Sequence, residues 1–322
     1  MTSMRLGSLA LFALACAMPA AAQAQFPVKP VRLIVPFPPG GSSDTLGRIV
    51  GQRLGDGLGQ QVIVENRPGV AGNIGAEAVA KAPPDGYTLL LGNLDQAISV
   101  SLNNRLNYSL ARDLAPVSWL AFTPLIVTVH ASLPVRSIKD LVGLARARPN
   151  ELAVSSPGVG SSGHLGAVLL GQMAGIRMTQ VAYKGGAPAT IALLTGEVAV
   201  GFPALPTALQ HMKSGKLRGL AVTSAQRAAS APDVPTVSEG GLPGYEVVLW
   251  AGLYAPAATS KEIVAQLNRE AVNVLKLGDV RQRLDAAGIT PVGSTPEQFG
   301  TLVRDEIEKW AKVVKKAGMR PD

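Results

Sequence analysis

The stretch Pro36-Phe-Pro-Pro-Gly-Gly-Ser-Ser-Asp44 joins a strand-forming run, residues 31–36, to a helical pattern that begins near Ser42. The stretch Pro157-Gly-Val-Gly-Ser-Ser-Gly-His164 joins the run 152–156 to another helical pattern in the same way. Glycines let the backbone approach a ligand closely, and a serine caps a helix whose free N–H groups favour an anion. We interpret both stretches as anion-binding loops; the alternative is that both are ordinary strand-to-helix turns with good caps.

One helix N-terminus contributes about 0.3–1 kcal/mol toward binding an anion, whereas micromolar affinity requires about 8 kcal/mol. We therefore expect the two loops to converge on one ligand. Two further loops follow strand-forming runs: Tyr183-Lys-Gly-Gly186 and Gly92-Asn-Leu-Asp-Gln96. The second lies where open α/β sheets bind ligands, beyond the carboxyl end of a strand. Lys184 is open to two interpretations, a contact to a ligand carboxylate or a surface lysine.

Short strand-forming runs alternate with helical patterns along the whole chain, which is typical of an α/β protein with parallel sheets. Ser137 with Asp140 is expected to cap one helix. Thr259 with Glu262 and Thr295 with Gln298 match the capping-box pattern at two later helices. The expected further strands are residues 61–65, 125–130, 179–183, 198–202, 217–223 and 246–254.

Composition excludes several classes of protein. The chain has 322 residues, of which 47% are hydrophobic and 16% charged, so it can bury a sizeable core and is not globally disordered. The formal net charge is +8, but the densest lysine cluster, within residues 309–316, is interleaved with acidic residues. This pattern indicates a solvated helix face, so we expect no nucleic-acid partner.

The N-terminus has the features of an export signal. Arg5 precedes an apolar run at 6–18, and Ala22-Gln-Ala24 matches an A-x-A cleavage site. We expect a signal peptide at 1–24, cleavage near Ala24 and a periplasmic mature protein. Cys16, the single cysteine, is alternatively a lipid anchor, although the residues before it match a lipobox poorly. After residue 25 no apolar run reaches 18 residues, so stable membrane insertion is not expected.

Enzyme motifs are weak. Residues 158–163 form a literal G-x-G-x-x-G, but no Asp or Glu occurs between His164 and Gly196, where a dinucleotide site needs an acid for the ribose. Ser162 and His164 leave an exported serine hydrolase as an alternative, although the G-x-S-x-G elbow is missing. No spacing of His, Asp or Glu suggests a metal site, and we expect no cofactor.

At these residues the chain resembles the Bug family, the TctC-like extracytoplasmic solute-binding receptors of tripartite tricarboxylate transporters. The resemblance starts with the loop at 36–44 and covers essentially the whole mature chain. It extends through Val64-Glu-Asn-Arg-Pro-Gly69, Ala82-Pro-Pro-Asp-Gly-Tyr87, the loops at 160–164 and 183–186, Pro232-Asp-Val-Pro-Thr236 and Gly241-Leu-Pro-Gly-Tyr-Glu246.

The resemblance implies a two-lobed periplasmic binding-protein fold of the type II kind, with a central cleft and two interlobe crossovers. Lobe 1 would comprise residues 25–125 plus 246–322, and lobe 2 residues 126–245. The function implied is non-enzymatic capture of a small carboxylate or amino acid for membrane transporter subunits, by a monomer. A sensory input subunit of the same fold is an alternative. The implied ligand-binding residues are Pro39, Gly40, Gly41, Ser42, Asp44, Asn93, Asp95, Gly160, Ser161, Ser162, His164, Tyr183, Lys184 and Gly185.

One residue departs from the family pattern. The loop after Gly92 usually carries small polar residues, and here it contains Asp95. An ionised acid at this position would repel a second ligand carboxylate. We therefore expect Asp95 to contact an amino or other donor group of the ligand, which favours an amino acid or a monocarboxylate.

Overall fold

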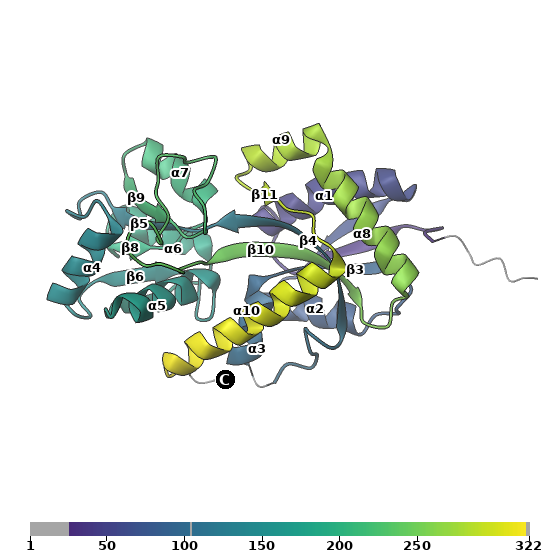
Figure 1. Ribbon diagram of the computed structural model, residues 1–322, viewed down its shortest axis with the longest axis horizontal. Helices are drawn as coiled ribbons and strands as arrows, with labels where there is room; N and C mark the ends of the chain where they lie inside the picture. The colour runs from purple at the N-terminus through teal and green to yellow at the C-terminus, as the bar shows by residue number, and fades with distance from the viewer. Residues whose placement is uncertain (1–25, 104, 320–322) are drawn as a thin grey trace, which may run out of the picture.

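The computed structural model describes residues 26–103 and 105–319, and it contains two sheets that form two lobes (Figure 1). The six-stranded sheet of lobe 1 has the order β11-β4-β10-β3-β1-β2. Its strands are β1 (Val31–Val35), β2 (Val62–Asn66), β3 (Thr88–Asn93), β4 (Leu114–Pro124), β10 (Val248–Pro256) and β11 (Thr290–Pro291). Its helices are η1 (Val70–Gly72), α1 (Ser42–Leu58), α2 (Asn73–Ala80), α3 (Leu94–Leu102), α8 (Lys261–Lys276), α9 (Gly278–Ala286) and α10 (Pro296–Lys316).

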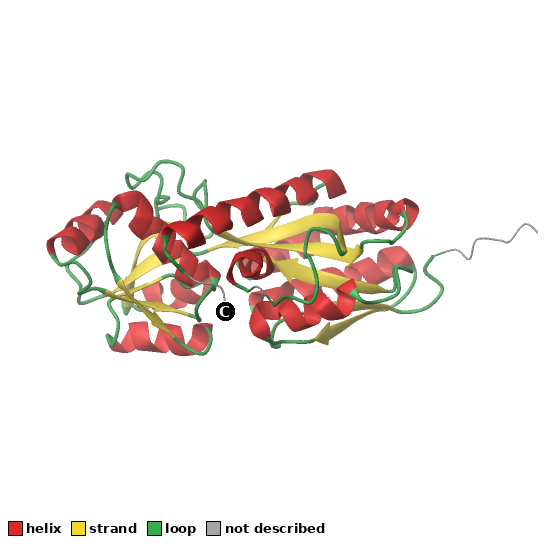
Figure 2. Cartoon of the chain, turned by 90° about the horizontal axis from the view of Figure 1, so that it is seen from below, coloured by secondary structure: helices red, strands yellow, loops and turns green. Residues whose placement is uncertain are grey.

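The sheet of lobe 2 has five strands in the order β7-β6-β8-β5-β9. They are β5 (Ile126–His130), β6 (Ala153–Ser156), β7 (Thr179–Ala182), β8 (Val200–Gly201) and β9 (Leu217–Val222). The helices of this lobe are α4 (Ile138–Ala147), α5 (Ser162–Ala174), α6 (Gly186–Thr195) and α7 (Leu205–Lys213). Figure 2 shows helices on both faces of the sheets, so that each sheet has its apolar residues covered.

Both sheets are mixed, which corrects the expectation of parallel sheets. Strands β1, β2 and β3 are parallel, but β10 runs antiparallel to β3 and to β4. In lobe 2, β6 is parallel to β7 and β8, whereas β5 is antiparallel to β8 and β9. These antiparallel pairs involve β5 and β10, and no helix precedes either strand directly: β5 comes straight after β4, and β10 follows the segment 223–247. A parallel pair would need a longer crossover connection.

The two crossings between the lobes lie side by side. Strand β4 ends at Pro124 and β5 begins at Ile126, so that Leu125 alone separates the sheets on the outward path. Thr223, just after β9, donates its N–H to the Leu125 carbonyl at 3.0 Å, and its own carbonyl accepts the Val247 N–H at 2.9 Å. Because both connections are short extended segments joined by hydrogen bonds, they form the geometry of a hinge.

The C-terminal helix ties the lobes together. Helix α10 packs on α3 and β4 of lobe 1 and reaches α5 of lobe 2, as Figure 1 shows. Gln172 of α5 donates to the Val313 carbonyl at 2.9 Å. The buried side chains of α10, including Phe299 and Trp310, belong to a hydrophobic cluster that continues into lobe 2. Lobe 1 therefore has two cores, one shared across the lobes and one between its sheet and α1 and α8.

The expected caps are partly confirmed. Thr295 and Gln298 form the capping box of α10, and Ser137 caps α4 through the Asp140 N–H. The cap of α8 is Ser260 rather than Thr259, since the Ser260 side chain accepts the Ile263 N–H. The segment after β3 was expected to be a loop; it is helix α3, capped by Asn93.

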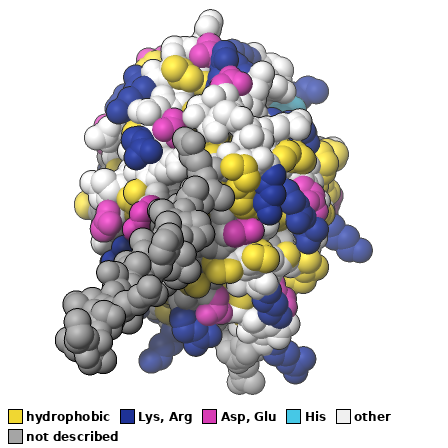
Figure 3. All heavy atoms as spheres, turned by 90° about the vertical axis from the view of Figure 1, so that its right-hand side faces the viewer, with side chains coloured by type: hydrophobic (Ala, Val, Ile, Leu, Met, Phe, Trp, Pro, Cys, Tyr) yellow, Lys and Arg dark blue, Asp and Glu magenta, His cyan; other side chains and the backbone are white. Residues whose placement is uncertain are grey.

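On the face shown in Figure 3, lysine and arginine side chains are scattered among acidic and uncharged ones. Many of the basic residues of the described chain are paired: Arg53 contacts Asp56 and Asp279, and Lys312 contacts Glu308. This distribution agrees with the dispersed charge expected from the sequence.

Candidate functional site

A cavity of about 600 Å³ lies between the lobes. Lobe 1 contributes the loop after β1 and the start of α3, and lobe 2 contributes the loop after β6 and the starts of α6 and α7. Leu125 and Leu249, on the segments that cross between the lobes, line it as well. The predicted site residues that line the cavity are Pro39, Gly40, Gly41, Ser42, Asn93, Asp95, Ser161 and Ser162.

The first turns of five helices border this cavity. Cavity-lining residues occur at the N-termini of α1, α3, α5, α6 and α7, represented by Ser42, Asn93, Ser162, Gly186 and Ala204. The first N–H groups of each helix have no partner within the helix, and each N-terminus carries a partial positive charge, so each stabilises an anion nearby. The cavity therefore favours a negatively charged ligand. The positive charge that attracts such a ligand comes from backbone N–H groups and not from side chains.

Ionisable side chains are nearly missing from the cavity wall. Among the lining residues that the structure describes, Asp95 is the single ionisable one. Burial raises the pKa of Asp95 from 3.8 to about 6, and hydrogen bonds from the N–H and hydroxyl of Ser162 lower it in part. Lys184 does not line the cavity. A negatively charged ligand in this cavity would consequently be balanced by helix N-termini, because no lysine or arginine belongs to the described lining.

The first loop is held by a buried carboxylate. Asp44, only 4% exposed, accepts the Gly40 N–H at 2.9 Å and the Arg48 Nε–H at 3.0 Å on Oδ2. Asn66 donates its Nδ2–H to Asp44 Oδ1 at 2.9 Å and to the Phe37 carbonyl at 3.0 Å. Burial opposes ionisation, but the hydrogen bonds from Arg48, Gly40 and Asn66 hold the pKa of Asp44 below its ordinary value. Asp44 thus shapes the loop from behind and does not line the cavity.

His164 has a similar position in lobe 2. Its Nδ1 accepts the Gly160 N–H at 3.0 Å, which requires that this nitrogen carries no proton. Burial lowers the pKa of His164, so the ring is neutral and remains an acceptor. Ser161 completes the loop: its Oγ donates to the Gly158 carbonyl at 2.8 Å and accepts the His164 N–H at 3.3 Å. Gly160 and His164 therefore stabilise the loop and lie outside the cavity lining.

The arrangement does not form the hydrolase pair of Ser162 and His164. Ser162 directs its N–H and hydroxyl to Asp95, with the N–H to Oδ1 distance at 3.3 Å. His164 Nδ1 is engaged by the Gly160 N–H. A serine nucleophile needs hydrogen-bond contact with its base, and the two side chains have other partners here.

The third loop lies beside the cavity rather than in it. The Tyr183 hydroxyl donates to Glu197 at 2.7 Å, and the Gly185 N–H donates to the Pro157 carbonyl at 2.9 Å. The residues from this region that line the cavity are Gly186, Ala187 and Thr190 of α6. Sequence reasoning missed these residues and the apolar wall of Phe202, Leu249 and Leu125, because their patterns match those of ordinary core residues.

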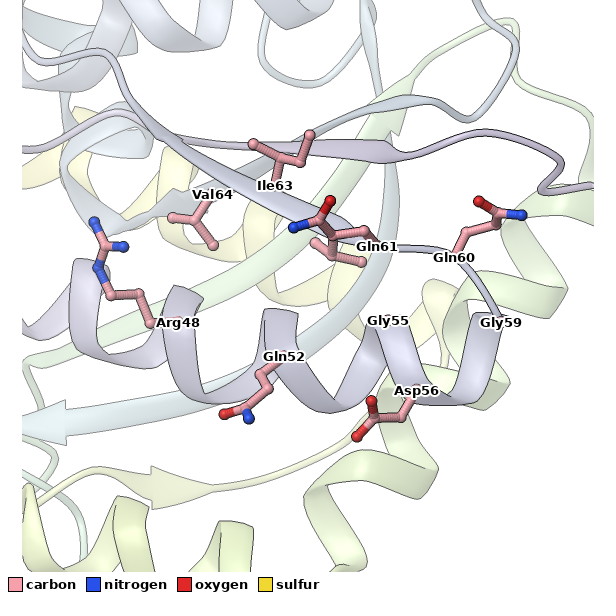
Figure 4. A pocket seen from close by; sticks show the side chains of 10 residues that line it. Arg48, Gln52, Gly55, Asp56, Gly59, Gln60, Gln61, Ile63 and Val64 are labelled. Atoms are coloured by element: carbon pink, nitrogen blue, oxygen red, sulfur yellow. The ribbon is translucent and has the colours of Figure 1, made fainter.

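A second hollow lies on the outer edge of lobe 1. This open groove of about 750 Å³ runs between α1 and the edge strand β2, and Arg48, Gln52, Asp56, Gln61 and Ile63 are among its lining residues (Figure 4). All of its lining residues come from α1, β2 and the turn between them, and none lines the interlobe cavity. The groove thus lacks the converging helix N-termini, and we place the functional site between the lobes.

Two lobes joined by a paired crossing, with an anion-favouring cavity between them, define a two-lobed solute-binding protein. Residues 46–319 match the family model TctC, described as the tripartite tricarboxylate transporter family receptor. The chain belongs to this family. It is 39% identical over 297 residues to the protein BugT of Bordetella pertussis, covering 92% of this chain and 91% of BugT.

Solved structures agree with this assignment. R. palustris Rpa4515 with adipate has a TM-score of 0.82 and 38% identity, covering 92% of this chain and 100% of that chain. MatC from Rhodopseudomonas palustris with bound malate has a TM-score of 0.77 and 34% identity, covering 90% of this chain and 100% of that chain. These relatives are solute-binding proteins and not enzymes, and this chain is a receptor of the same kind.

Receptors of this family are periplasmic. Within residues 26–103 and 105–319, no helix has both the length and the apolar character required to cross a bilayer. The expected signal peptide, its cleavage site and Cys16 lie outside the described residues.

Proposed function

We propose that this receptor captures a small carboxylate or amino acid in the interlobe cavity and delivers it to the membrane subunits of a tripartite transporter. The observation that carries this proposal is the convergence of five helix N-termini on one cavity without a cationic side chain in its described lining. The bound adipate and malate of two similar structures are small carboxylates, which supports the same ligand class.

The ligand carboxylate is proposed to lie against the N-terminus of α1. Gly40, Gly41 and Ser42 line the cavity there, and Gly41 is the N-cap residue, with no side-chain cap of its own. Backbone N–H groups of this turn are therefore suited to donate to the ligand. Ser161 and Ser162 of lobe 2 complete the contact, while Asp44, Gly160 and His164 position the two loops.

Asp95 is proposed to contact a donor group of the ligand. Its Oδ1 is engaged by Ser162, and the carboxylate lines the cavity. An ammonium or hydroxyl at the far end of the ligand would pair with it, which suits an amino acid or a monocarboxylate.

Ligand capture is proposed to close the two lobes about the paired crossing, so that the membrane subunits recognise the closed form. The lobes would divide at residues 125 and 245, a division supported by the crossings at Leu125 and Val247. We further propose that the receptor acts as a monomer and that residues 1–24 direct its export.

A ligand-side comparison tests the proposal. Native mass spectrometry of the protein purified without refolding identifies a co-purified ligand, and calorimetry then compares that carboxylate with its neutral carboxamide. We expect the carboxamide to bind at least tenfold more weakly, about 1.4 kcal/mol. A Lys184→Ala variant serves as control and should retain the difference. Equal affinity for the two ligands contradicts the proposal, as does ester hydrolysis that Ser162→Ala abolishes.

A further inference from the structure

The Asp95 carboxylate is a contact between the two lobes. Asp95 belongs to the first turn of α3 in lobe 1, and its Oδ1 accepts the N–H of Ser162, the first residue of α5 in lobe 2, at 3.3 Å. The two residues are 67 positions apart in the chain. A carboxylate supplied by the protein itself therefore occupies the kind of position that a helix N-terminus offers to an anion.

Other donors of the same turn of α5 are also engaged. The His164 N–H donates to Ser161 Oγ at 3.3 Å, and the Leu165 N–H donates to the Ser161 carbonyl at 2.9 Å. Helix α1 differs, because its N-cap is Gly41, which has no side chain to accept such a bond. The two facing helix N-termini are thus unequal with respect to the cavity: the carboxylate at α5, that of Asp95, lines the cavity, whereas the carboxylate in the first turn of α1, that of Asp44, is bound to Arg48 and does not line it.

We propose that Asp95 is the residue that limits the ligand to a single carboxylate, by occupying the α5 N-terminus in place of a second ligand carboxylate. The proposal rests on the function proposed above and adds the charge of the ligand to it. It assigns the ligand carboxylate to α1 and leaves the region near Asp95 to an uncharged or donor-bearing group.

Electrostatics supports this assignment. With a pKa of about 6, Asp95 is ionised at neutral pH. No cationic side chain belongs to the described lining of the cavity, so no side chain there would offset two neighbouring carboxylates. Like charges in a partly desolvated site repel more strongly than in water, which disfavours a dianion relative to a monoanion of equal length.

The test uses ligands of equal length and different charge. Calorimetry measures the dissociation constants of monocarboxylates, ω-amino carboxylates and dicarboxylates of three to six carbons. The proteins are the wild type, Asp95→Asn, Asp95→Ser and the control Asp305→Asn, which removes one negative charge from an exposed position in lobe 1. The melting temperature of each variant shows that it is folded.

For the wild type we expect the preferred monocarboxylate or amino carboxylate to bind at least tenfold more tightly than the dicarboxylate of the same length. Asp95→Asn and Asp95→Ser should reduce this ratio at least tenfold, and Asp305→Asn should leave it unchanged. An unchanged ratio in both Asp95 variants overturns the inference. An equal gain in affinity for all ligands in the two Asp95 variants overturns it as well. That result would mean that Asp95 only competes with any ligand for the N-terminus of α5. If the wild type binds none of these carboxylates, the proposed function fails as well.

Discussion

Asp44 Oδ2 accepts the backbone N–H of Gly40 at 2.9 Å, which fixes the loop in front of α1 from its buried side. Gly40 has a φ of +84°, a conformation that favours glycine, so the loop depends on both residues. The carboxylate is also bound by Arg48 and Asn66, and the last of these holds the Phe37 carbonyl. A residue outside the cavity lining therefore decides the shape of one half of the site.

An Asp44→Asn variant tests this relationship. The amide accepts only through its oxygen, so either Asn66 loses its acceptor or Gly40 and Arg48 both lose theirs, and we expect stability to fall by about 1–3 kcal/mol. Because the loop loses its support, ligand affinity should fall about tenfold, or about 1.4 kcal/mol. Chemical denaturation and calorimetry measure the two effects. Asp56→Asn, an exposed change on the same helix, is the control; equal behaviour of the two variants would contradict the prediction.

The pH dependence of stability reports on Asp95. Its pKa is about 6 in the folded protein against 3.8 for the ordinary group, so the folded state binds the proton more tightly. The stability that protonation provides is complete below about pH 3.8 and is lost as the pH rises through 6. An asparagine cannot ionise, so Asp95→Asn does not lose stability as the pH rises. This variant should therefore stabilise the ligand-free protein at pH 7.5, by on the order of 2–3 kcal/mol.

Differential scanning calorimetry of the wild type and Asp95→Asn at pH 4, 5.5 and 7.5 measures this effect. The difference in melting temperature should be near zero at pH 4 and should grow up to pH 7.5. Asp305→Asn, measured in parallel, corrects for the general effect of one lost charge. A difference that does not vary with pH would show that Asp95 is not destabilising through its ionisation.

A close glycine contact between the lobes involves Gly160 and Leu102. A Cβ added at Gly160, where φ is +76°, would lie 2.7 Å from Leu102 Cδ1 at the end of α3. Gly160→Ala should therefore disfavour this arrangement of the lobes and weaken ligand binding about fivefold, or about 1 kcal/mol. The additional Leu102→Ala change should restore most of the affinity, as a double-mutant cycle would record.

Gly175→Ala is the matched control for this cycle. Gly175 also has a positive φ, +63°, but a Cβ there meets nothing within 4 Å. Both variants should lose stability because alanine is strained in this conformation. Only Gly160→Ala should lose ligand affinity, and an equal loss in both would refute an interlobe origin.

Gly252 of β10 accommodates the ring of Phe299 from α10. A Cβ at this position would lie 2.1 Å from Phe299 Cζ. The ring is fully buried and packs against Trp250 and Tyr254, with centroid distances of 5.8 and 4.7 Å, so it has little space to move. We expect Gly252→Ala to cost about 1–3 kcal/mol.

Gly278→Ala provides the comparison, because a Cβ there meets nothing within 4 Å and alanine favours the first turn of α9. Thermal denaturation should show a lower melting temperature for Gly252→Ala and an equal or higher one for Gly278→Ala. A neutral Gly252→Ala would mean that α10 can shift away from the sheet.

Local patterns predicted much of the fold. The glycine- and serine-rich loops before α1 and α5 and the capping box of Thr295 are short-range features, and each occurs where it was expected. The predicted loop after β3 is wrong: the segment is helix α3, and Asn93 and Gln96 have the capping-box spacing that marks the start of a helix. Asp95 and Gln96 are polar, and a polar run directly after a strand also matches the pattern of a ligand-binding loop.

Other site features had no local signature. Leu249, Phe202 and Leu125 line the cavity, yet they stand in apolar runs that look like any core strand. Tyr183 and Lys184 stand in a loop of the right composition, and the direction in which that loop leaves its strand keeps them out of the lining. The direction in which a loop leaves its strand depends on how whole helices and strands pack together, so a short stretch of sequence does not determine it.

The sequence by itself determined the alternation of strands and helices, the two glycine- and serine-rich loops and the resemblance to one receptor family, because these depend on residues close together in the chain. The serine cap expected at the first of these loops is wrong, since the N-cap of α1 is Gly41. Only the tertiary structure decided that both sheets are mixed, that Asp44 and His164 support their loops from behind, and that Asp95 meets Ser162. That last contact joins residues 67 positions apart, and its geometry is set by how α3 and α5 of two separate lobes are held across a common hinge.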